Sequence, residues 1–298
     1  MPNFSNSESA VISLFPKDAE FSFRGKKYVV IRCCKPRPST GECKTDVFLE
    51  LLEKGTHNVI VYKISVKQDN ADFLENKISY ERAKEIFGNN VSAIISESIS
   101  QIRKSFEDDY LVYFKSHGKT EDKTIKIGWK FELMNKISGE KSALLQLTDE
   151  QKLDVYSGIN LSDDKKNSYV GNEVVVNSGV AEYLLVVSDT NNLTVEKCLG
   201  SLIPLESYVK DINIYFACKA INYRVNKDKW DGDRPLSVWV DWKLKNGKLD
   251  GELNLEQPLA KRANEIGENI RSLLKTLKID AKNFGRLKEK LSKGVRYY

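Results

Sequence analysis

Two neighbouring segments of the chain carry the alternation of apolar and polar residues that is typical of β-strands. Thr45 to Leu52 and Asn58 to Lys67 are rich in β-branched and aliphatic residues, and Gly55-Thr56 between them fits a two-residue hairpin loop. Such a loop predicts the register of the hairpin and therefore which residues share a face. One face is wholly apolar and is expected in the core; it consists of Val47, Leu49, Leu51, Ile60, Tyr62 and Ile64.

The opposite face of this hairpin gathers polar residues at its open end. Asp46 is expected opposite Ser65, and Lys67 lies two residues further along the same strand and points the same way. An aspartate binds a hard divalent cation, which polarises a phosphate and activates water, while a nearby lysine orients the nucleophile or offsets developing charge. The three residues therefore indicate phosphodiester hydrolysis.

The segments KTDV, which contains Asp46, and ISVK, which ends at Lys67, resemble the PD-(D/E)XK nuclease superfamily, and in particular bacterial type II restriction endonucleases. The resemblance is local and covers roughly residues 41–87. The chain departs from the usual motif at two positions: Thr45 stands where proline is common, and Ser65 stands where a second acidic ligand is expected. Members of the superfamily that carry Ser-x-Lys obtain the missing carboxylate from the following helix.

We therefore expect the second carboxylate on a helix after Lys67. Asn70 is a favourable N-cap for a helix from Ala71 to Phe87, whose early turns would bring Glu75 close to the end of the Lys67 strand. Glu75 is the first choice, and Glu81 is the second. The resemblance implies the following site: Asp46 and Glu75 as metal ligands, Lys67 organising the water, Ser65 as a minor ligand or a spacer, and Mg²⁺, with Mn²⁺ as a substitute, as the cofactor.

Periodicity in the rest of the chain predicts a β-rich second half that ends in helices. The expected elements are a strand at 27–34, a helix at 91–106, hairpins at 110–134 and 236–255, a capped helix at 148–156, strands at 182–188 and 210–225, and two helices within 258–292. The expected fold class is α/β, a PD-(D/E)XK-like mixed sheet flanked by helices. Residues 1–110 are expected to form the nuclease core, and residues 111–298 a β-rich and helical region for DNA recognition and dimerisation. The alternative that both regions form one intertwined domain stays open.

A competing motif lies in the second half of the chain. Asp241 and Lys243 form a literal D-x-K, and Asp211 precedes them at the start of a predicted strand. Lys243 lies next to a tight turn at Asn246-Gly247, where a lysine needs no functional reason, and no glutamate-bearing helix follows closely. We therefore favour the site at Asp46.

The composition argues against several other chemistries. The 298 residues include 47 basic and 42 acidic side chains, and the net charge of +5 permits a polyanionic partner. Five cysteines without a C-x-x-C favour a reducing cytoplasm over a disulfide framework or a zinc site. Only two histidines occur, and Walker A and G-x-G-x-x-G motifs are absent. Without a long apolar run or a basic leader, the chain is expected neither to be secreted nor to enter a membrane.

These observations favour a cytoplasmic type II restriction endonuclease that cleaves double-stranded DNA at a specific sequence. The resemblance implies a homodimer in which each subunit cuts one strand, and a functional pairing with a DNA methyltransferase. Two alternatives remain open. One is a DNA-binding protein whose nuclease-like core is inactive, because Ser65 replaces a carboxylate. The other is a DNA repair or mobile-element nuclease without sequence specificity.

Overall fold

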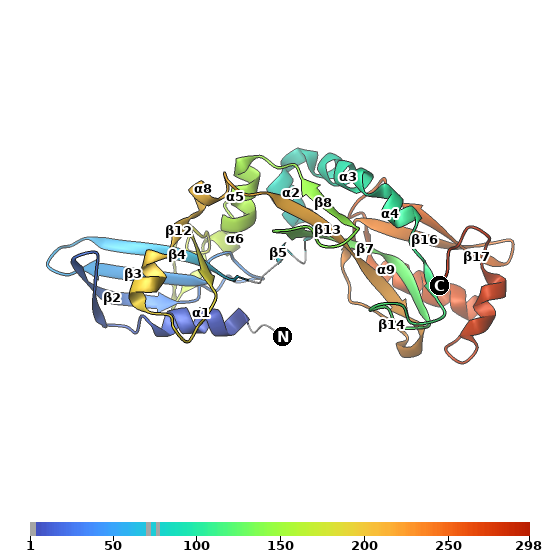
Figure 1. Cartoon of the computed structure of the whole chain (residues 1–298), viewed down its shortest axis with the longest axis horizontal. Coiled ribbons are helices and arrows are strands. Elements are labelled where there is room, and N and C mark those ends of the chain that lie inside the picture. Colours follow the sequence, from blue (N-terminus) through green and yellow to red (C-terminus); the bar gives the residue numbers. More distant parts are fainter. Residues whose placement is uncertain (1–3, 70–72, 76–77) are drawn as a thin grey trace. The chain divides into compact units, whose positions relative to one another are not determined.

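The computed structural model describes residues 4–69, 73–75 and 78–298. The chain divides into two compact units, the first comprising Met1–Asp72 and Leu147–Asn213 and the second comprising Phe73–Gln146 and Ile214–Tyr298 (Figure 1). This division differs from the expected boundary at residues 110/111, because the chain enters the second unit earlier and later returns to the first. Local periodicity predicts elements, but it does not predict which distant segments pair with one another.

The first unit is built on a six-stranded sheet in the order β1-β2-β3-β4-β11-β12. These strands span Glu20–Phe23, Lys26–Cys34, Val47–Glu53, Val59–Gln68, Tyr183–Val187 and Ile203–Pro204. Neighbouring strands are antiparallel except for β4 and β11, which run parallel. The region that carries Asp46 and Lys67 is therefore a mixed sheet, as the sequence predicts.

The hairpin of β3 and β4 has the predicted register, in which Val47 pairs with Ile64. Its tight turn lies one residue earlier than expected, because the N–H of Thr56 donates to the carbonyl oxygen of Glu53 at 3.1 Å. Gly55 adopts the positive φ of 83° that such a turn requires. The shift of the turn leaves the pairing unchanged, so the polar residues keep their expected face.

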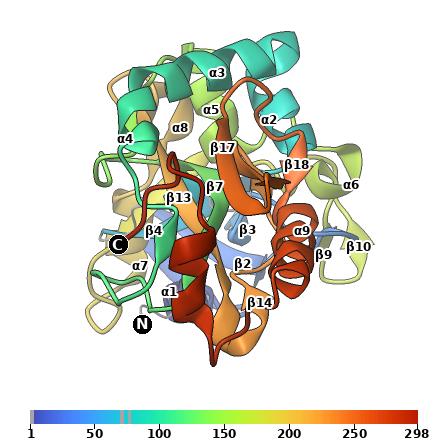
Figure 2. The same cartoon turned by 90° about the vertical axis from the view of Figure 1, so that its right-hand side faces the viewer.

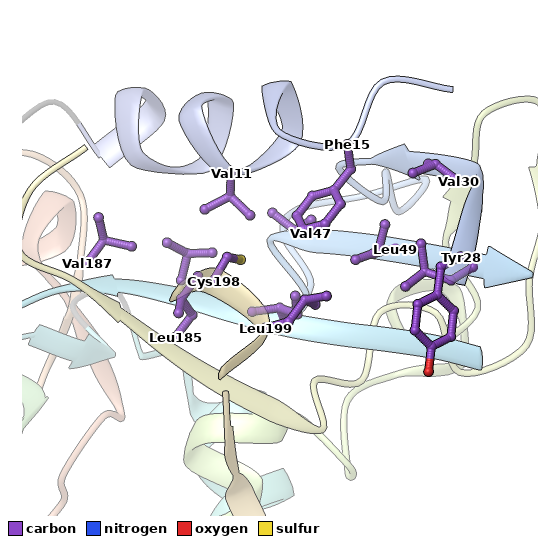
Figure 3. Packing of buried hydrophobic residues seen from close by; sticks show 13 residues of the cluster. Val11, Phe15, Tyr28, Val30, Val47, Leu49, Leu185, Val187, Cys198 and Leu199 are labelled. Carbon is purple, nitrogen blue, oxygen red and sulfur yellow. The ribbon is translucent and has the colours of Figure 1, made fainter. Parts of the chain in front are cut away.

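Helix α1, Phe4–Ser13, covers the apolar face of this sheet. Val11 and Phe15 are almost fully buried, and both point into the core that Val47 and Leu49 line (Figure 3). The sequence pattern of residues 1–25 predicts a polar lead followed by short apolar pieces and no helix, because serine and asparagine residues interrupt the apolar stripe. Burial against the sheet stabilises a helix that is too short and too polar to form by local propensity alone.

Short helices and a two-stranded hairpin complete the first unit. They are α5 (Asp149–Ser157), α6 (Asp163–Lys166), β9 (Tyr169–Val170), β10 (Glu173–Val174), α7 (Val195–Gly200) and α8 (Leu205–Tyr208). Helix α5 begins with the predicted capping box. The Thr148 hydroxyl accepts a hydrogen bond from Gln151 N at 3.2 Å, and Gln151 Oε1 accepts one from Thr148 N at 3.0 Å.

The second unit contains an eight-stranded sheet whose main order is β14-β13-β7-β16-β17. Its strands are β5 (Phe73–Glu75), β6 (Val112–Tyr113), β7 (Thr124–Met134), β8 (Ser142–Leu145), β13 (Ile214–Arg224), β14 (Lys229–Trp230), β16 (Val238–Lys245) and β17 (Lys248–Asn254), while β15 (Pro235–Leu236) pairs separately with β18 (Lys261–Arg262). Phe131 of β7 and Phe216 of β13 stack in its core with ring centroids 5.2 Å apart. This unit supplies the β-rich part of the chain.

Helices flank this second sheet. They are α2 (Tyr80–Phe87), α3 (Val91–Gln101), α4 (Arg103–Glu107) and α9 (Ala263–Thr276), with short 3₁₀ segments at Gly88–Asn90, Val225–Lys227 and Phe284–Lys290. Helix α9 packs against β16, where Asn269 Nδ2 donates to the Trp242 carbonyl oxygen at 2.7 Å. It also contacts β14 and β18 (Figure 2). The prediction of a second C-terminal helix is wrong, because Phe284–Lys290 forms a 3₁₀ segment. Within the described ranges, no helix is long and apolar enough to cross a bilayer.

Two further expectations need correction. The helix expected at 71–87 begins only after Ser79, whose hydroxyl accepts from Arg82 N, and Phe73–Glu75 is strand β5. The expected cap Asn70 lies outside the described residues. The hairpin expected at 110–134 is confirmed by the pairing of β6 with β7, but Lys126 and Trp129 are buried instead of facing solvent.

Candidate functional site

Asp46 is the residue immediately before β3, and the hairpin fixes the position of its carboxylate. Its N–H donates to the Ile64 carbonyl oxygen at 2.8 Å, which extends the hairpin pairing beyond β3. Its Oδ2 accepts from the Val66 N–H at 2.8 Å and from the Ser65 hydroxyl at 3.3 Å. Because the side chain is only 17% exposed, the carboxylate is held in one orientation at the end of the hairpin.

Ser65 and Lys67 lie on the same face of β4, two residues apart. Ser65 is 1% exposed, and its hydroxyl donates to Asp46. Ser65 therefore orients the aspartate, which is closer to the role of a spacer than to that of a ligand. Lys67 is half-buried near the end of the strand. The structure thus brings Asp46 and Ser65 together as the sequence predicts.

Glu8 of α1 is a candidate site residue that the sequence pattern misses. Lys35 Nζ lies 2.5 Å from Glu8 Oε2 and 3.9 Å from Asp46 Oδ1, and both carboxylates are largely buried. Burial raises the pKa of Glu8, the hydrogen bond from Lys35 opposes this rise, and the charge of Asp46 adds to it. The positive charge of Lys67 also acts on Glu8. Glu8 and Asp46 therefore share the Lys35 ammonium at this end of the first sheet, where the charge of Lys67 acts on Glu8 and that of Glu42 acts on Lys35.

The sequence contains one signal that could have revealed Glu8. Val11 and Phe15 are four residues apart, which places them on one side of a helix, and Glu8 lies one turn before Val11 on nearly the same side. Because α1 packs this side on the sheet, Glu8 is carried to the end of the hairpin. The signal is short, and it becomes informative only once the helix is known to be there.

Lys35 begins the loop that leads from β2 to Asp46. Burial lowers the pKa of its ammonium, but the hydrogen bond to Glu8 and the charges of Glu8 and Asp46 outweigh this effect and raise the pKa. Lys35 is therefore positively charged at neutral pH and links the two carboxylates. Its side chain is 51% exposed, so the ammonium is accessible from solvent.

The departure from proline at Thr45 has a structural reason in this chain. The N–H of Thr45 donates to the Gly179 carbonyl oxygen at 3.2 Å, and the neighbouring N–H of Lys44 donates to the same oxygen at 3.0 Å. A proline at position 45 has no N–H and would lose this contact. The segment around Gly179 thus holds the strand entry that positions Asp46.

Glu75 and Glu81, the two glutamates expected from the sequence, belong to the second unit, whereas Asp46, Ser65 and Lys67 belong to the first. Glu75 lies on β5, where its Oε1 accepts from Arg82 Nε at 3.1 Å. Glu81 lies in the first turn of α2, and hydrogen bonds from its own backbone N–H and from Ser79 lower its pKa. The carboxylate that the structure groups with Asp46 within the first unit is Glu8.

The competing D-x-K motif lies on an exposed strand of the second unit. Lys243 Nζ is 2.7 Å from Glu252 Oε2 and 4.0 Å from Asp241 Oδ2, and all three side chains are at least 45% exposed. Asp211 belongs to the other unit. Asn246 and Gly247 have the positive φ values, 52° and 72°, of the predicted type I′ turn. These residues are accounted for as solvent-facing cross-strand pairs beside a turn.

Asp46 and Glu8 are the carboxylates at the end of the β3–β4 hairpin that could hold a magnesium ion. Magnesium is commonly held by one or two carboxylates, with waters and substrate phosphates completing its shell. Asp46 and Glu8 supply two hard oxygen ligands, and a cationic group, the Lys35 ammonium, already lies within reach of both. Across the described part of the chain, no group of three or more histidine, cysteine, aspartate and glutamate residues is placed to hold a metal. Any magnesium site here therefore relies on water and substrate for its remaining ligands.

Comparison with known protein families, with curated proteins and with solved structures gives no match for this chain.

Proposed function

We propose that this chain is a metal-dependent endonuclease that cleaves double-stranded DNA at a specific sequence, as type II restriction endonucleases do. The observation that carries the proposal is the grouping of Asp46 and Glu8 around one ammonium, beside Lys67, at the end of a mixed sheet. A carboxylate pair with an adjacent lysine is a combination suited to phosphodiester hydrolysis. The local resemblance of the Asp46 and Lys67 segments to the PD-(D/E)XK superfamily supports the same activity.

Each residue has a role that follows from its contacts. Asp46 and Glu8 hold the cation, and Ser65 and the Val66 N–H fix the orientation of Asp46. When bound, Mg²⁺ polarises the scissile phosphate and lowers the pKa of a water molecule. Lys67 lies on the same face of β4 as Ser65, and its charge acts on Glu8; in this proposal it orients the attacking water or offsets charge on the phosphate. Lysine and arginine of the loop before Asp46, Lys35 and Arg37, are available to contact the DNA backbone.

Incubation with a plasmid of mixed sequence and Mg²⁺ tests this function directly. Discrete fragments are expected, and they should be absent in EDTA and weak in Ca²⁺, whose larger and looser shell misplaces the water. A smear would identify a nuclease without sequence specificity. Intact supercoiled DNA that is nevertheless bound would identify an inactive DNA-binding protein. Cleavage that persists in EDTA would contradict the metal-dependent mechanism.

The partners that the resemblance implies belong to the same proposal. A palindromic site would be cut by a homodimer, with one active site for each strand, and a DNA methyltransferase would protect the host sequence. Sedimentation of the protein alone, and with an oligonucleotide that contains the cleaved sequence, measures whether the protein is a dimer. Resistance to cleavage of a plasmid prepared from the source cell measures whether a DNA methyltransferase protects the sequence.

A further inference from the structure

The end of the β3–β4 hairpin already contains a cation of the protein's own. The Lys35 ammonium lies 2.5 Å from Glu8 Oε2 and 3.9 Å from Asp46 Oδ1. Each carboxylate side chain is 17% exposed, so the two acids share one ammonium in a partly desolvated setting. The charge of Lys67 also acts on Glu8, and the charge of Glu42 also acts on Lys35, so three carboxylates and two ammonium groups make this group negative. A divalent cation that entered the group would make its net charge positive.

The backbone next to Lys35 is held by hydrogen bonds, whereas the Lys35 side chain is half-exposed. The residue follows directly on β2, and the backbone of Arg37, two residues later, exchanges hydrogen bonds of 2.9 Å in both directions with Tyr169. The Lys35 side chain itself is 51% exposed. A lysine ammonium is a strongly hydrated point charge on a flexible stem, so it moves between a carboxylate and solvent at little cost.

We propose that Lys35 is an internal competitor for the divalent cation and, once displaced, a ligand for a DNA phosphate. This inference rests on the proposed metal-dependent function. In the metal-free protein Lys35 neutralises Glu8 and Asp46, and metal binding expels its ammonium because like charges repel at this distance. The released ammonium and the excess positive charge then favour an anionic phosphate at the same place. Metal binding and DNA binding therefore strengthen each other through Lys35.

The first test measures Mn²⁺ binding by titration calorimetry, without DNA, in wild type and in Lys35→Met. Removal of the competing charge should tighten Mn²⁺ binding by about tenfold, the size of effect expected for one nearby charge. Lys54→Met is the matched control, because Lys54 is also half-exposed and pairs with a glutamate, Glu20, elsewhere on the same sheet. Mn²⁺ affinity of Lys54→Met should equal that of wild type.

The second test measures DNA affinity in Ca²⁺, which supports binding with little cleavage, as a function of salt. Lys35→Met should lose one phosphate contact, so the slope of log affinity against log salt should become shallower by about 0.9. Lys54→Met should keep the wild-type slope. A Lys35→Met protein with unchanged or weaker Mn²⁺ affinity, or with an unchanged salt slope, would overturn the role of Lys35 while leaving the metal site standing. Absence of saturable Mn²⁺ binding by wild type and Lys35→Met alike would overturn both this inference and the proposed function.

Discussion

The Asp46 side chain accepts hydrogen bonds from the neighbouring strand β4 and is also a proposed metal ligand, and two substitutions separate these functions. Asp46→Ala removes the acceptor of the Val66 N–H and the Ser65 hydroxyl, so the free energy of unfolding should fall by about 1–3 kcal/mol. Asp46→Asn keeps an acceptor oxygen but lacks the charge, so it should fold normally and lose cleavage by several orders of magnitude. Urea unfolding and single-turnover cleavage measure the two effects. Normal cleavage by folded Asp46→Asn would exclude this aspartate from the chemistry.

The identity of the second carboxylate is decided by a matched pair of substitutions, Glu8→Gln and Glu75→Gln. Glu8→Gln should weaken Mn²⁺ binding and abolish cleavage, because Glu8 shares Lys35 with Asp46. Glu75→Gln removes an ion pair from the nearly buried Arg82, so its effect should be on the stability of the second unit. Calorimetric Mn²⁺ titration and cleavage assays compare the two proteins. Loss of cleavage in folded Glu75→Gln but not in Glu8→Gln would restore Glu75 as the ligand.

At the scale of the elements, a buried ion pair joins β7 to the segment that follows α4. Lys126 is 4% exposed, and its Nζ lies 2.7 Å from Asp109 Oδ1, while Lys141 Nζ lies 2.9 Å from Asp109 Oδ2. Burial lowers the pKa of Lys126, and the charge of Lys141 adds to this, whereas Asp109 opposes it. Burial by itself raises the pKa of Asp109, but the two lysines outweigh burial and lower it. The Asp109 carboxylate thus forms ion pairs with both Lys126 and Lys141.

Asp109→Asn should therefore be strongly destabilising, by about 3–5 kcal/mol at neutral pH, because it leaves Lys126 buried without a counter-charge. Asp108→Asn is the control: Asp108 pairs with Arg296 at an exposed site, so its loss should cost less than about 1 kcal/mol. Since the folded-state pKa of Asp109 is lowered, its contribution is complete above the ordinary carboxyl pKa of about 4 and is lost as the pH falls through the lowered value. The difference between wild type and Asp109→Asn, measured by urea unfolding, should disappear in acid.

The elements also show what the sequence predicts well and why. The β3–β4 register follows from alternation, because a slip by one residue would expose the whole apolar face, and it is observed residue by residue. The α5 capping box and the Asn246-Gly247 turn are likewise local features with strong residue preferences, and both are observed. Of these features, the β3–β4 register is the one that positions Asp46, Ser65 and Lys67.

What escaped prediction depends on contacts between distant segments. Helix α1 has a polar sequence and is stabilised by the sheet beneath it, so the spacing of Glu8, Val11 and Phe15 is too short a signal to predict the helix by itself. The segment 73–75 has the sequence of an early helical turn but pairs with β7 as a strand, so Glu75 lies on β5 and not on the expected helix. Pairing with a distant strand overrides local propensity here.

At the scale of the whole molecule, the first unit is formed by two separate segments of the chain, and the first of them ends a few residues after Lys67 of the proposed active site. Strand β4 ends at Gln68, and the second unit begins at Phe73. The chain comes back to form α5 and then β11, the parallel neighbour of β4. The strand that carries Lys67 thus leads almost directly into the second unit.

Two hydrophobic cores in one chain predict two unfolding events. Phe15 is 1% exposed in the first core, and Phe131, stacked on Phe216, is 1% exposed in the second. Each Phe→Ala substitution should cost about 3–5 kcal/mol, because it removes a fully buried ring and leaves a cavity. In scanning calorimetry, Phe15→Ala should lower one transition and Phe131→Ala the other, each on the order of 10 °C. Val59→Ala, at a 45% exposed position of the first sheet, should move neither transition appreciably. A single transition that both substitutions lower equally would mean that the two units unfold as one cooperative structure.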